Sequence, residues 1–243
     1  MAIPDTSSPL PIDQLQRTGY AILPGVFSAE EASEFAGRLE AALAADESSV
    51  LRSRGQTYGS RDLIRLLPEI CELPKRPDLK EFITAMLGPR AGLVRALYFD
   101  KPPDRGWSLT WHKDCTIAVK RTDLPSSHFR RPTLKTGIPH VEAPESLLKQ
   151  MLTLRLHVDA MTPENGPLSI IPGSHTEEIE NDQQAIEIHT AAGDVFAMRP
   201  LLTHSSSSPK EGTNMHRRVV HLEFASSAEL PDGYEWHSFY SVS

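Results

Sequence analysis

The chain has 243 residues, 39% of them hydrophobic, and is long enough to bury a sizeable core in one large domain or two small ones. Its formal net charge of −7 and the lack of a long Lys/Arg run argue against a nucleic-acid partner or an anionic membrane surface. Cys71 and Cys115 have no CxxC partner, which excludes a cysteine-ligated zinc site. No apolar run is as long as a membrane span, and the N-terminus lacks signal-peptide features, so we expect a cytoplasmic protein. The composition does not indicate an oligomeric state.

The first part of the chain is predicted to be mainly helical. A short helix and a strand over Tyr20 to Leu23 come first. Ser28 and Glu31 form a capping-box pattern, which predicts a helix that runs to about Asp46. The polar stretch 47–60 contains two glycines and is predicted to be a loop. Further helices are expected over residues 61–70 and 77–88.

From residue 91 onward the apolar pattern changes to that of strands. Strands are predicted over 92–100, 108–120, 151–160, 185–190, 194–200 and 217–225, with a short one between two turns in 162–175. The Pro-rich segment 121–150 contains a short helical piece and otherwise no clear periodicity. A stretch of this length in a compact domain typically forms a functional lid or is disordered, and we expect a lid.

This order of elements predicts an α+β fold. Helices that precede a run of antiparallel strands favour a double-stranded β-helix, the jelly-roll or cupin-like architecture, with N-terminal flanking helices. We expect a single domain over residues 1–243. Its helical flank would cover residues 12–90, and its jelly-roll core residues 91–226, including the lid at 121–150.

Two side chains that can bind a metal lie close together in the second predicted strand. His112 and Asp114 are two positions apart, and residues so spaced on a strand point to the same face. Among the other histidines, His204 is the strongest candidate for a third ligand, because it follows a predicted strand in a run of small hydroxyl residues. Two histidines and one carboxylate form the facial triad of non-heme Fe(II) oxygenases.

Six segments together resemble the phytanoyl-CoA dioxygenase family of Fe(II)/2-oxoglutarate oxygenases, and they occur in the family's order. They are GYAILPGVFS (19–28), FDKPPD (99–104), WHKD (111–114), LRLHVDAMTPENGPLSIIPGSH (154–175), AGDVFAMRPLLTHSS (192–206) and HRRVVHLEFA (216–225). The resemblance implies a dioxygenase that uses Fe(II), O2 and the cosubstrate 2-oxoglutarate. It would hydroxylate a small organic substrate and release succinate and CO2.

The resemblance also implies roles for individual residues. His112, Asp114 and His204 would bind the iron. Arg217 matches the arginine that binds the far carboxylate of 2-oxoglutarate, and Ser206 matches a hydroxyl that assists. On a regular strand Arg217 shares a face with Val219, His221 and Glu223, whereas Arg218 faces the other way and is the weaker choice. Because Asp114 fills the carboxylate position that halogenases leave open for chloride, the resemblance argues against halogenation.

Substrate contacts are less well defined by the sequence. Trp111, Arg155, Lys101 and His140 are candidates. Against these roles, Trp111 would pack in the core, Arg155 would form a surface salt bridge, and Lys101 would simply be solvated. A CoA ester would need a basic rim, which residues of the 121–150 segment could supply: Arg121, Arg130, Arg131 and Lys135.

Two other classes of function use the same ligands. One is a non-oxidative cupin-like enzyme, an isomerase or hydrolase with zinc or manganese. The other is a non-catalytic protein that senses a small molecule. Neither needs an arginine that faces the metal, so Arg217 favours the oxygenase. The identity of the small-molecule substrate does not follow from the sequence.

Overall fold

The computed structural model of the chain describes residues 10–46, 50–53, 56–103, 106–176 and 184–243. The helices are α1 (Ile12–Thr18), α2 (Ala29–Ala45), α3 (Leu63–Leu66), α4 (Pro77–Leu87) and α5 (Glu145–Leu148), with 3-10 turns η1 (Pro68–Lys75) and η2 (Pro231–Gly233). The strands of the first half are β1 (Tyr20–Leu23), β2 (Val50–Ser53), β3 (Gln56–Ser60), β4 (Gly92–Lys101), β5 (Leu109–His112), β6 (Thr116–Ala118), β7 (Arg130–Lys135) and β8 (Ile138–Glu142). Those of the second half are β9 (Met151–His157), β10 (Leu168–Ile170), β11 (Ile186–Ile188), β12 (Val195–Met198), β13 (His204–Ser206), β14 (Arg217–Ala225) and β15 (Tyr240–Ser241).

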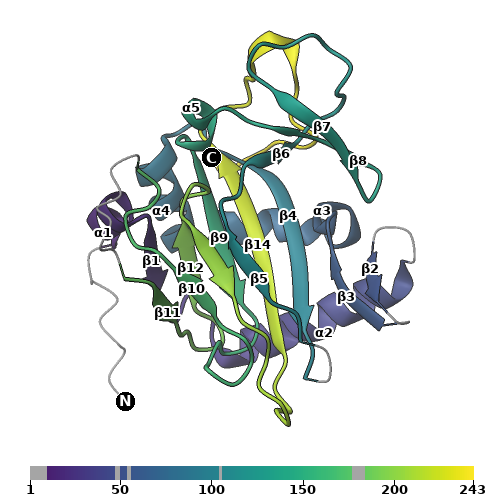
Figure 1. Cartoon of the computed structure of the whole chain (residues 1–243), viewed down its shortest axis with the longest axis vertical. Coiled ribbons are helices and arrows are strands. Elements are labelled where there is room, and N and C mark those ends of the chain that lie inside the picture. The colour runs from purple at the N-terminus through teal and green to yellow at the C-terminus, as the bar shows by residue number, and fades with distance from the viewer. Residues whose placement is uncertain (1–9, 47–49, 54–55, 104–105, 177–183) are drawn as a thin grey trace.

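A large antiparallel sheet forms the centre of the molecule (Figure 1). Its strand order is β1-β12-β9-β14-β4-β3-β2, and β15 also pairs with β4. The central strand β14 pairs with β4 on one side and with β9 on the other, so it is hydrogen-bonded along both edges. This position fixes the direction of every side chain on β14.

Helices cover one face of the large sheet. Alternate residues of β14, such as Leu222 and Phe224, pack against helix residues such as Leu39 and Phe82 in one apolar cluster. Helix α2 begins with the predicted capping box, in which the Ser28 hydroxyl accepts a hydrogen bond from the backbone N–H of Glu31. The helical flank is therefore attached to the sheet by the main hydrophobic core.

A smaller sheet of order β11-β10-β13-β5 lies over the opposite face of the large sheet (Figure 1). Towards β12 and β1 the space between the sheets is filled by an apolar cluster that includes Ile170, Phe196, Met198 and Leu202. Towards β14 and β4 charged side chains surround a cavity instead. The predicted α+β fold with two facing antiparallel sheets is confirmed, although the strand pairing in the described residues closes no barrel.

A third sheet of order β6-β8-β7 corrects two of the predictions. The segment 121–150 was expected to be without regular structure beyond a short helix, but it contains β7, β8 and α5. The strand expected over 108–120 is divided into β5 and β6, which belong to different sheets. The third sheet packs on its own apolar cluster, to which Tyr234 and Trp236 contribute from the C-terminal segment.

The segment 47–60 was predicted to be a loop, and this is wrong for its described part. Residues 47–49 and 54–55 lie outside the described residues, but β2 and β3 form a hairpin on either side of the latter pair. The hairpin joins the large sheet through Gly59 and Ser60, which pair with Phe99 and Tyr98. In the part of the chain that the structure describes, no helix has the length and apolarity needed to cross a membrane.

Candidate metal centre and substrate cavity

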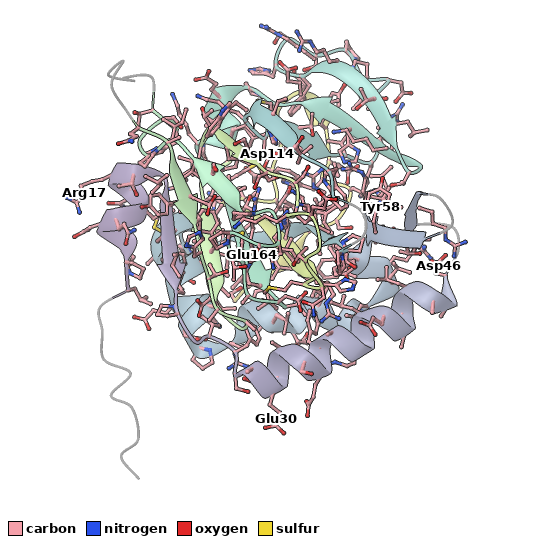
Figure 2. The ribbon with its side chains drawn as sticks, turned by 60° about the horizontal axis from the view of Figure 1, so that its bottom comes forward. Arg17, Glu30, Asp46, Tyr58, Asp114 and Glu164 are labelled. Atoms are coloured by element: carbon pink, nitrogen blue, oxygen red, sulfur yellow. The ribbon has the colours of Figure 1, made fainter. Side chains whose placement is uncertain are left out.

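A cavity of about 880 Å³ lies between the large and small sheets, near the sizes typical of small-molecule sites. Its wall includes Tyr58, Arg61, Arg95, Leu97, Phe99, Trp107, Leu109, His112, Asp114, Thr116, Lys135, Arg155, His204, Ser206, Arg217, Val219, His221 and Glu223. Figure 2 shows Asp114 within the body of the molecule, away from the outer positions of Arg17 and Glu30. The residues expected to bind metal and cosubstrate therefore face one cavity.

Strand β14 supplies a row of cavity side chains by regular alternation. Arg217, Val219, His221 and Glu223 line the cavity, as predicted from their spacing. Arg218 points to the other face, where its guanidinium donates to both carboxylate oxygens of Asp159. The preference for Arg217 over Arg218 as the cavity arginine is confirmed.

His112, Asp114 and His204 form the one group of potential metal ligands found among the described residues, with their ligand atoms within 4.8 Å of one another. The two histidines come together because they are cross-strand partners of β5 and β13. Their ring centroids are 4.2 Å apart. The Asp114 carboxylate lies 3.7 Å from Nε2 of His204.

Asp114 belongs to this cluster, but it lies in a loop and not on the predicted strand. The alternation of a single strand was predicted to place it beside His112, but β5 ends at His112 and Asp114 lies between two strands. Its backbone N–H donates to the carbonyl of Pro200 at 2.9 Å, and the Lys113 ammonium donates to the carbonyl of Ser174 at 2.9 Å. These contacts, to the loop before β13 and to the loop after β10, hold the carboxylate in place.

Hydrogen bonds also fix which nitrogen of each histidine faces the cluster. Nδ1 of His112 lies 2.7 Å from the carbonyl of Thr110, and Nδ1 of His204 lies 2.8 Å from the carbonyl of Leu202. Because a carbonyl only accepts, each Nδ1 donates to it, which leaves Nε2 of each ring as the nitrogen available to a metal. Burial and the nearby Arg155 lower the pKa of His204 to about 4, which keeps this imidazole neutral near pH 7.

Burial and the neighbouring side chains shift the pKa of Asp114 in opposite directions. Burial alone would raise the pKa of its carboxyl, but electrostatic interaction with His204, Arg155 and His112 holds that pKa below its ordinary value. Asp114 is therefore a carboxylate at neutral pH. Two imidazoles and one carboxylate are the donor set that suits Fe(II).

Arg155 lines the cavity next to this cluster. Its Nη2 lies 3.3 Å from Nε2 of His204 and 3.7 Å from Oδ2 of Asp114, and its Nε is buried without a partner among the described residues. It comes from β9 opposite His221 of β14, at the middle of the cavity. The expected orientation of Arg155 towards the pocket is confirmed.

Arg217 marks one end of the cavity. Its Nη1 donates to the sulfur of Met161 at 3.6 Å, and its buried Nε has no partner among the described residues. Burial and repulsion from Arg155 lower the pKa of Arg217 to about 10. Nearby, the Lys101 ammonium donates to the hydroxyl of Ser206 at 2.9 Å.

At the other end of the cavity, Arg95 and Glu223 form a buried pair. The Arg95 guanidinium donates to both carboxylate oxygens, at 2.6 and 2.8 Å. Arg61 and Lys135 line the cavity on this side. Neither Arg61 nor Arg95 is among the predicted site residues: Arg61 begins a predicted helix, whereas Arg95, a charged residue within an apolar strand, is a signal that could have identified the second of them.

Most of the other residues predicted to contact the substrate do not line the cavity. Trp111 is 47% exposed and does not line the cavity, so neither its expected packing in the core nor a direct contact from the wall is found. His140 is fully buried behind the wall, where its Nδ1 donates to the carbonyl of Ile138. Lys101 is buried behind Ser206 rather than solvated. Of the proposed basic rim, Lys135 enters the cavity, whereas Arg121 is exposed and paired with Asp123.

Comparisons with known proteins agree with this geometry. A sequence profile described as phytanoyl-CoA dioxygenase (PhyH) matches residues 15–211. Ectoine dioxygenase of Sphingopyxis alaskensis is 26% identical over 165 residues, which are 65% of this chain and 47% of the relative, so the match spans about half of that protein.

Two solved structures show the same fold. EctD from S. alaskensis with bound iron has a TM-score of 0.68 at 18% identity, and the match covers 95% of this chain and 84% of that one. The alpha-ketoglutarate-dependent epimerase SnoN of nogalamycin biosynthesis has a TM-score of 0.65 at 17% identity, covering 91% of this chain and 82% of that one. These matches confirm the predicted fold class.

Proposed function

Because the chain belongs to the phytanoyl-CoA dioxygenase family, we propose that it is an Fe(II)- and 2-oxoglutarate-dependent oxygenase that hydroxylates a small organic substrate. In such a reaction one atom of O2 enters a C–H bond of the substrate. The other atom enters succinate, which forms as 2-oxoglutarate loses CO2. Atoms and electrons balance without a further reductant.

The observation that carries this proposal is the placement of two sites in one cavity. His112, Asp114 and His204 offer the two imidazoles and one carboxylate that suit Fe(II). Arg217 offers a buried guanidinium whose Nε is unpartnered, which is costly unless an anion binds there. The far carboxylate of 2-oxoglutarate is such an anion, and a forked guanidinium suits it.

The chain's own residues would bind, orient and shield in this account. The carbonyls of Thr110 and Leu202 hold the two imidazoles with Nε2 towards the metal position. Arg217 and Ser206 would anchor the cosubstrate, with Lys101 supporting Ser206 from behind. When bound, the iron supplies the oxidising chemistry, and the protein excludes competing water by enclosing the site.

The type of product is the finer part of the proposal. The curated relative is named for ectoine oxidation, while similar structures include an epimerase and a carbocyclase that depend on alpha-ketoglutarate. We favour hydroxylation, because it is the direct outcome of oxidising a C–H bond and needs no second functional group on the substrate. Epimerisation and ring closure are the named alternatives.

The proposal is tested by incubating the purified protein with Fe(II), 2-oxoglutarate, O2 and a panel of candidate metabolites. We expect at least one metabolite to stimulate succinate release and to gain the mass of one oxygen atom. A product of unchanged mass indicates epimerisation, and a loss of two hydrogens indicates ring closure. Control incubations contain zinc or manganese in place of Fe(II). If no incubation with Fe(II) releases succinate, the oxygenase proposal is contradicted.

A further inference from the structure

The cavity wall carries more positive than negative charge. Five of its residues are cationic and only two are acidic, the carboxylates being Asp114 and Glu223. The cationic residues are Arg61, Arg95, Lys135, Arg155 and Arg217. Fe(II) and doubly charged 2-oxoglutarate would cancel one another, so loading the proposed function's partners leaves this excess unchanged.

Three of the cations already have a carboxylate partner. Arg217 would bind the cosubstrate carboxylate, and Arg155 lies 3.7 Å from the carboxylate of Asp114. Arg95 is neutralised by its two hydrogen bonds to Glu223. Arg61 and Lys135 are the two cavity cations to which no carboxylate has been assigned.

Arg61 and Lys135 have no ion-pair partner among the residues that the structure describes. Arg61 lies with its Cζ 5.7 Å from the centre of the Phe99 ring, and Lys135 donates to the hydroxyl of Thr116 at 2.9 Å. Burial and repulsion from Arg95 and Arg61 lower the pKa of Lys135. Two half-buried cations that repel each other are costly unless an anion is bound between them.

This pair lies towards the Arg95–Glu223 end of the cavity, since both Arg95 and Glu223 interact electrostatically with Arg61 and with Lys135. Along β14, Arg217 is opposite Lys101 and Glu223 is opposite Arg95. Arg217 and Glu223 are six positions apart on this strand, which corresponds to roughly 20 Å. Lys135 donates to Thr116, which lies two residues after Asp114 and also contacts Arg95, so Lys135 lies between the metal cluster and the Arg95–Glu223 end. An anion bound there would place the rest of its molecule beside the metal position.

We propose that Arg61 and Lys135 bind the acidic group of the substrate, so that the substrate is an organic anion, a carboxylate or a phosphate. This inference rests on the proposed function and narrows its substrate class. Arg61 would supply a planar fork and Lys135 a compact charge, which together suit an oxyanion.

The rest of the cavity wall indicates which groups the substrate carries besides its acidic group. Tyr58 and Trp107 make an edge-to-face contact at 5.4 Å, and Phe99 and Leu97 continue the surface. These side chains are apolar or aromatic, and Phe99 among them lies against Arg61. We expect the anion to carry an alkyl or aromatic portion that packs against them.

The test measures binding to the protein loaded with Fe(II) and 2-oxoglutarate without oxygen, so that the Arg217 end is occupied. The probes are hexanoate, octanoate and phenylacetate, their primary amides, and hexyl and phenethyl phosphates. Calorimetry gives the dissociation constants. We expect acids or phosphates to bind at least about tenfold more tightly than the amides, as loss of a charged hydrogen bond implies. The carboxylate and phosphate arms separate the two sources of charge.

The variants Arg61→Gln and Lys135→Met should each weaken anion binding by about tenfold and leave amide binding unchanged. Matched controls are Arg130→Gln on the exposed strand β7 and Lys80→Met on the exposed side of α4, which should change neither. The dissociation constant of 2-oxoglutarate should be the same in all five proteins, which shows that each variant is folded.

The result that overturns the inference is a set of anions that bind no more tightly than their amides, or anion binding that survives both substitutions. In that case 2-oxoglutarate still binds, and only the substrate class is wrong. If 2-oxoglutarate fails to bind to the Fe(II)-loaded wild-type protein, the proposed function itself has failed. The two failures are therefore distinguishable.

Discussion

Arg217 and Arg218 are neighbours in sequence with opposite environments. The Arg217 guanidinium is buried at the cavity end, whereas Arg218 is held by Asp159 on the other face and also donates to Glu40. Strand alternation alone produces this difference. It makes the two residues a matched pair for testing the cosubstrate site.

Arg217→Ala should weaken 2-oxoglutarate binding by about tenfold to a hundredfold, since one charged, buried contact is lost. Arg218→Ala should leave that dissociation constant unchanged and lower the free energy of unfolding by about 1 kcal/mol, through loss of the half-buried pair with Asp159. Calorimetry and urea unfolding measure the two quantities. Equal loss of affinity in both variants would contradict the assignment of Arg217.

Lys101 gives the cosubstrate site a pH dependence. Burial and repulsion from Arg217 lower the pKa of Lys101 to about 7, so its amine is partly neutral near pH 7. A bound dianion would favour the ammonium form and raise that pKa. Binding should therefore take up a proton, and 2-oxoglutarate affinity should fall as pH rises above about 7.

Calorimetry in buffers of different ionisation enthalpy measures this proton uptake directly. Lys101→Met should bind 2-oxoglutarate more weakly at low pH and show no proton uptake. Proton uptake that persists in Lys101→Met would assign it to another group and contradict the prediction.

The alternation of side chains along a strand could be predicted from the sequence, whereas the position of a loop residue could not. Alternation correctly oriented Arg217, His221 and Glu223, because β14 is regular and paired on both edges. It also predicted that Asp114 lies beside His112, but it assumed one continuous strand, whereas β5 ends at His112. Long-range loop contacts, which no local pattern encodes, decide the position of that carboxylate.

At the scale of elements, helix α2 was predictable because its signals are local. The Ser28 hydroxyl accepts from the Glu31 N–H at 3.0 Å, and the Glu31 carboxylate accepts from the Ser28 N–H at 2.7 Å. The hairpin β7–β8 was missed for the opposite reason. Its strand β7 is exposed along nearly its whole length, so its residues show no alternation of apolar and polar side chains.

Ser28→Ala should lower the free energy of unfolding by about 1 kcal/mol, because the first turn of α2 loses its cap. The control is Ser33→Ala, an exposed serine within the same helix, which should be neutral or slightly stabilising. Urea unfolding measures both. If the two variants are equally stable, the capping box does not contribute as described.

The turn before β12 requires a glycine for two separate reasons. Gly193 has a φ of +87°, and a Cβ there would lie 2.1 Å from the carbonyl oxygen of Phe27. Its backbone also links two segments, because the Gly193 N–H donates to His157 and its carbonyl accepts from Phe27.

Gly193→Ala should therefore destabilise the protein by more than the roughly 1–2 kcal/mol that the left-handed conformation costs an L-residue. Gly212→Ala is the control, since Gly212 has a φ of +79° but a Cβ there meets nothing within 4 Å. The difference in unfolding free energy between the variants isolates the steric part. Equal values would contradict the close contact with Phe27.

At the scale of the whole molecule, the two facing sheets are packed in one half and hollow in the other. The apolar cluster around Phe196 and Ile170 holds the sheets together, while β14 and β4 border the cavity. We propose that the whole chain forms one domain, because helices, sheets and the C-terminal Val242 share continuous apolar clusters. The lid role of 121–150 stays a prediction, although Lys135 extends from this segment into the cavity.

The most direct test of the account is an anaerobic titration of the protein with Fe(II) in the presence of 2-oxoglutarate. If iron is held by His112, Asp114 and His204 and chelated by the cosubstrate, a visible charge-transfer band should grow until iron and protein are equimolar. Asp114→Ala should show no saturable band, while a matched change outside the cavity, Asp123→Ala, should behave as the wild type. A band of unchanged strength in Asp114→Ala, or none in the wild-type protein, would contradict the proposed metal centre.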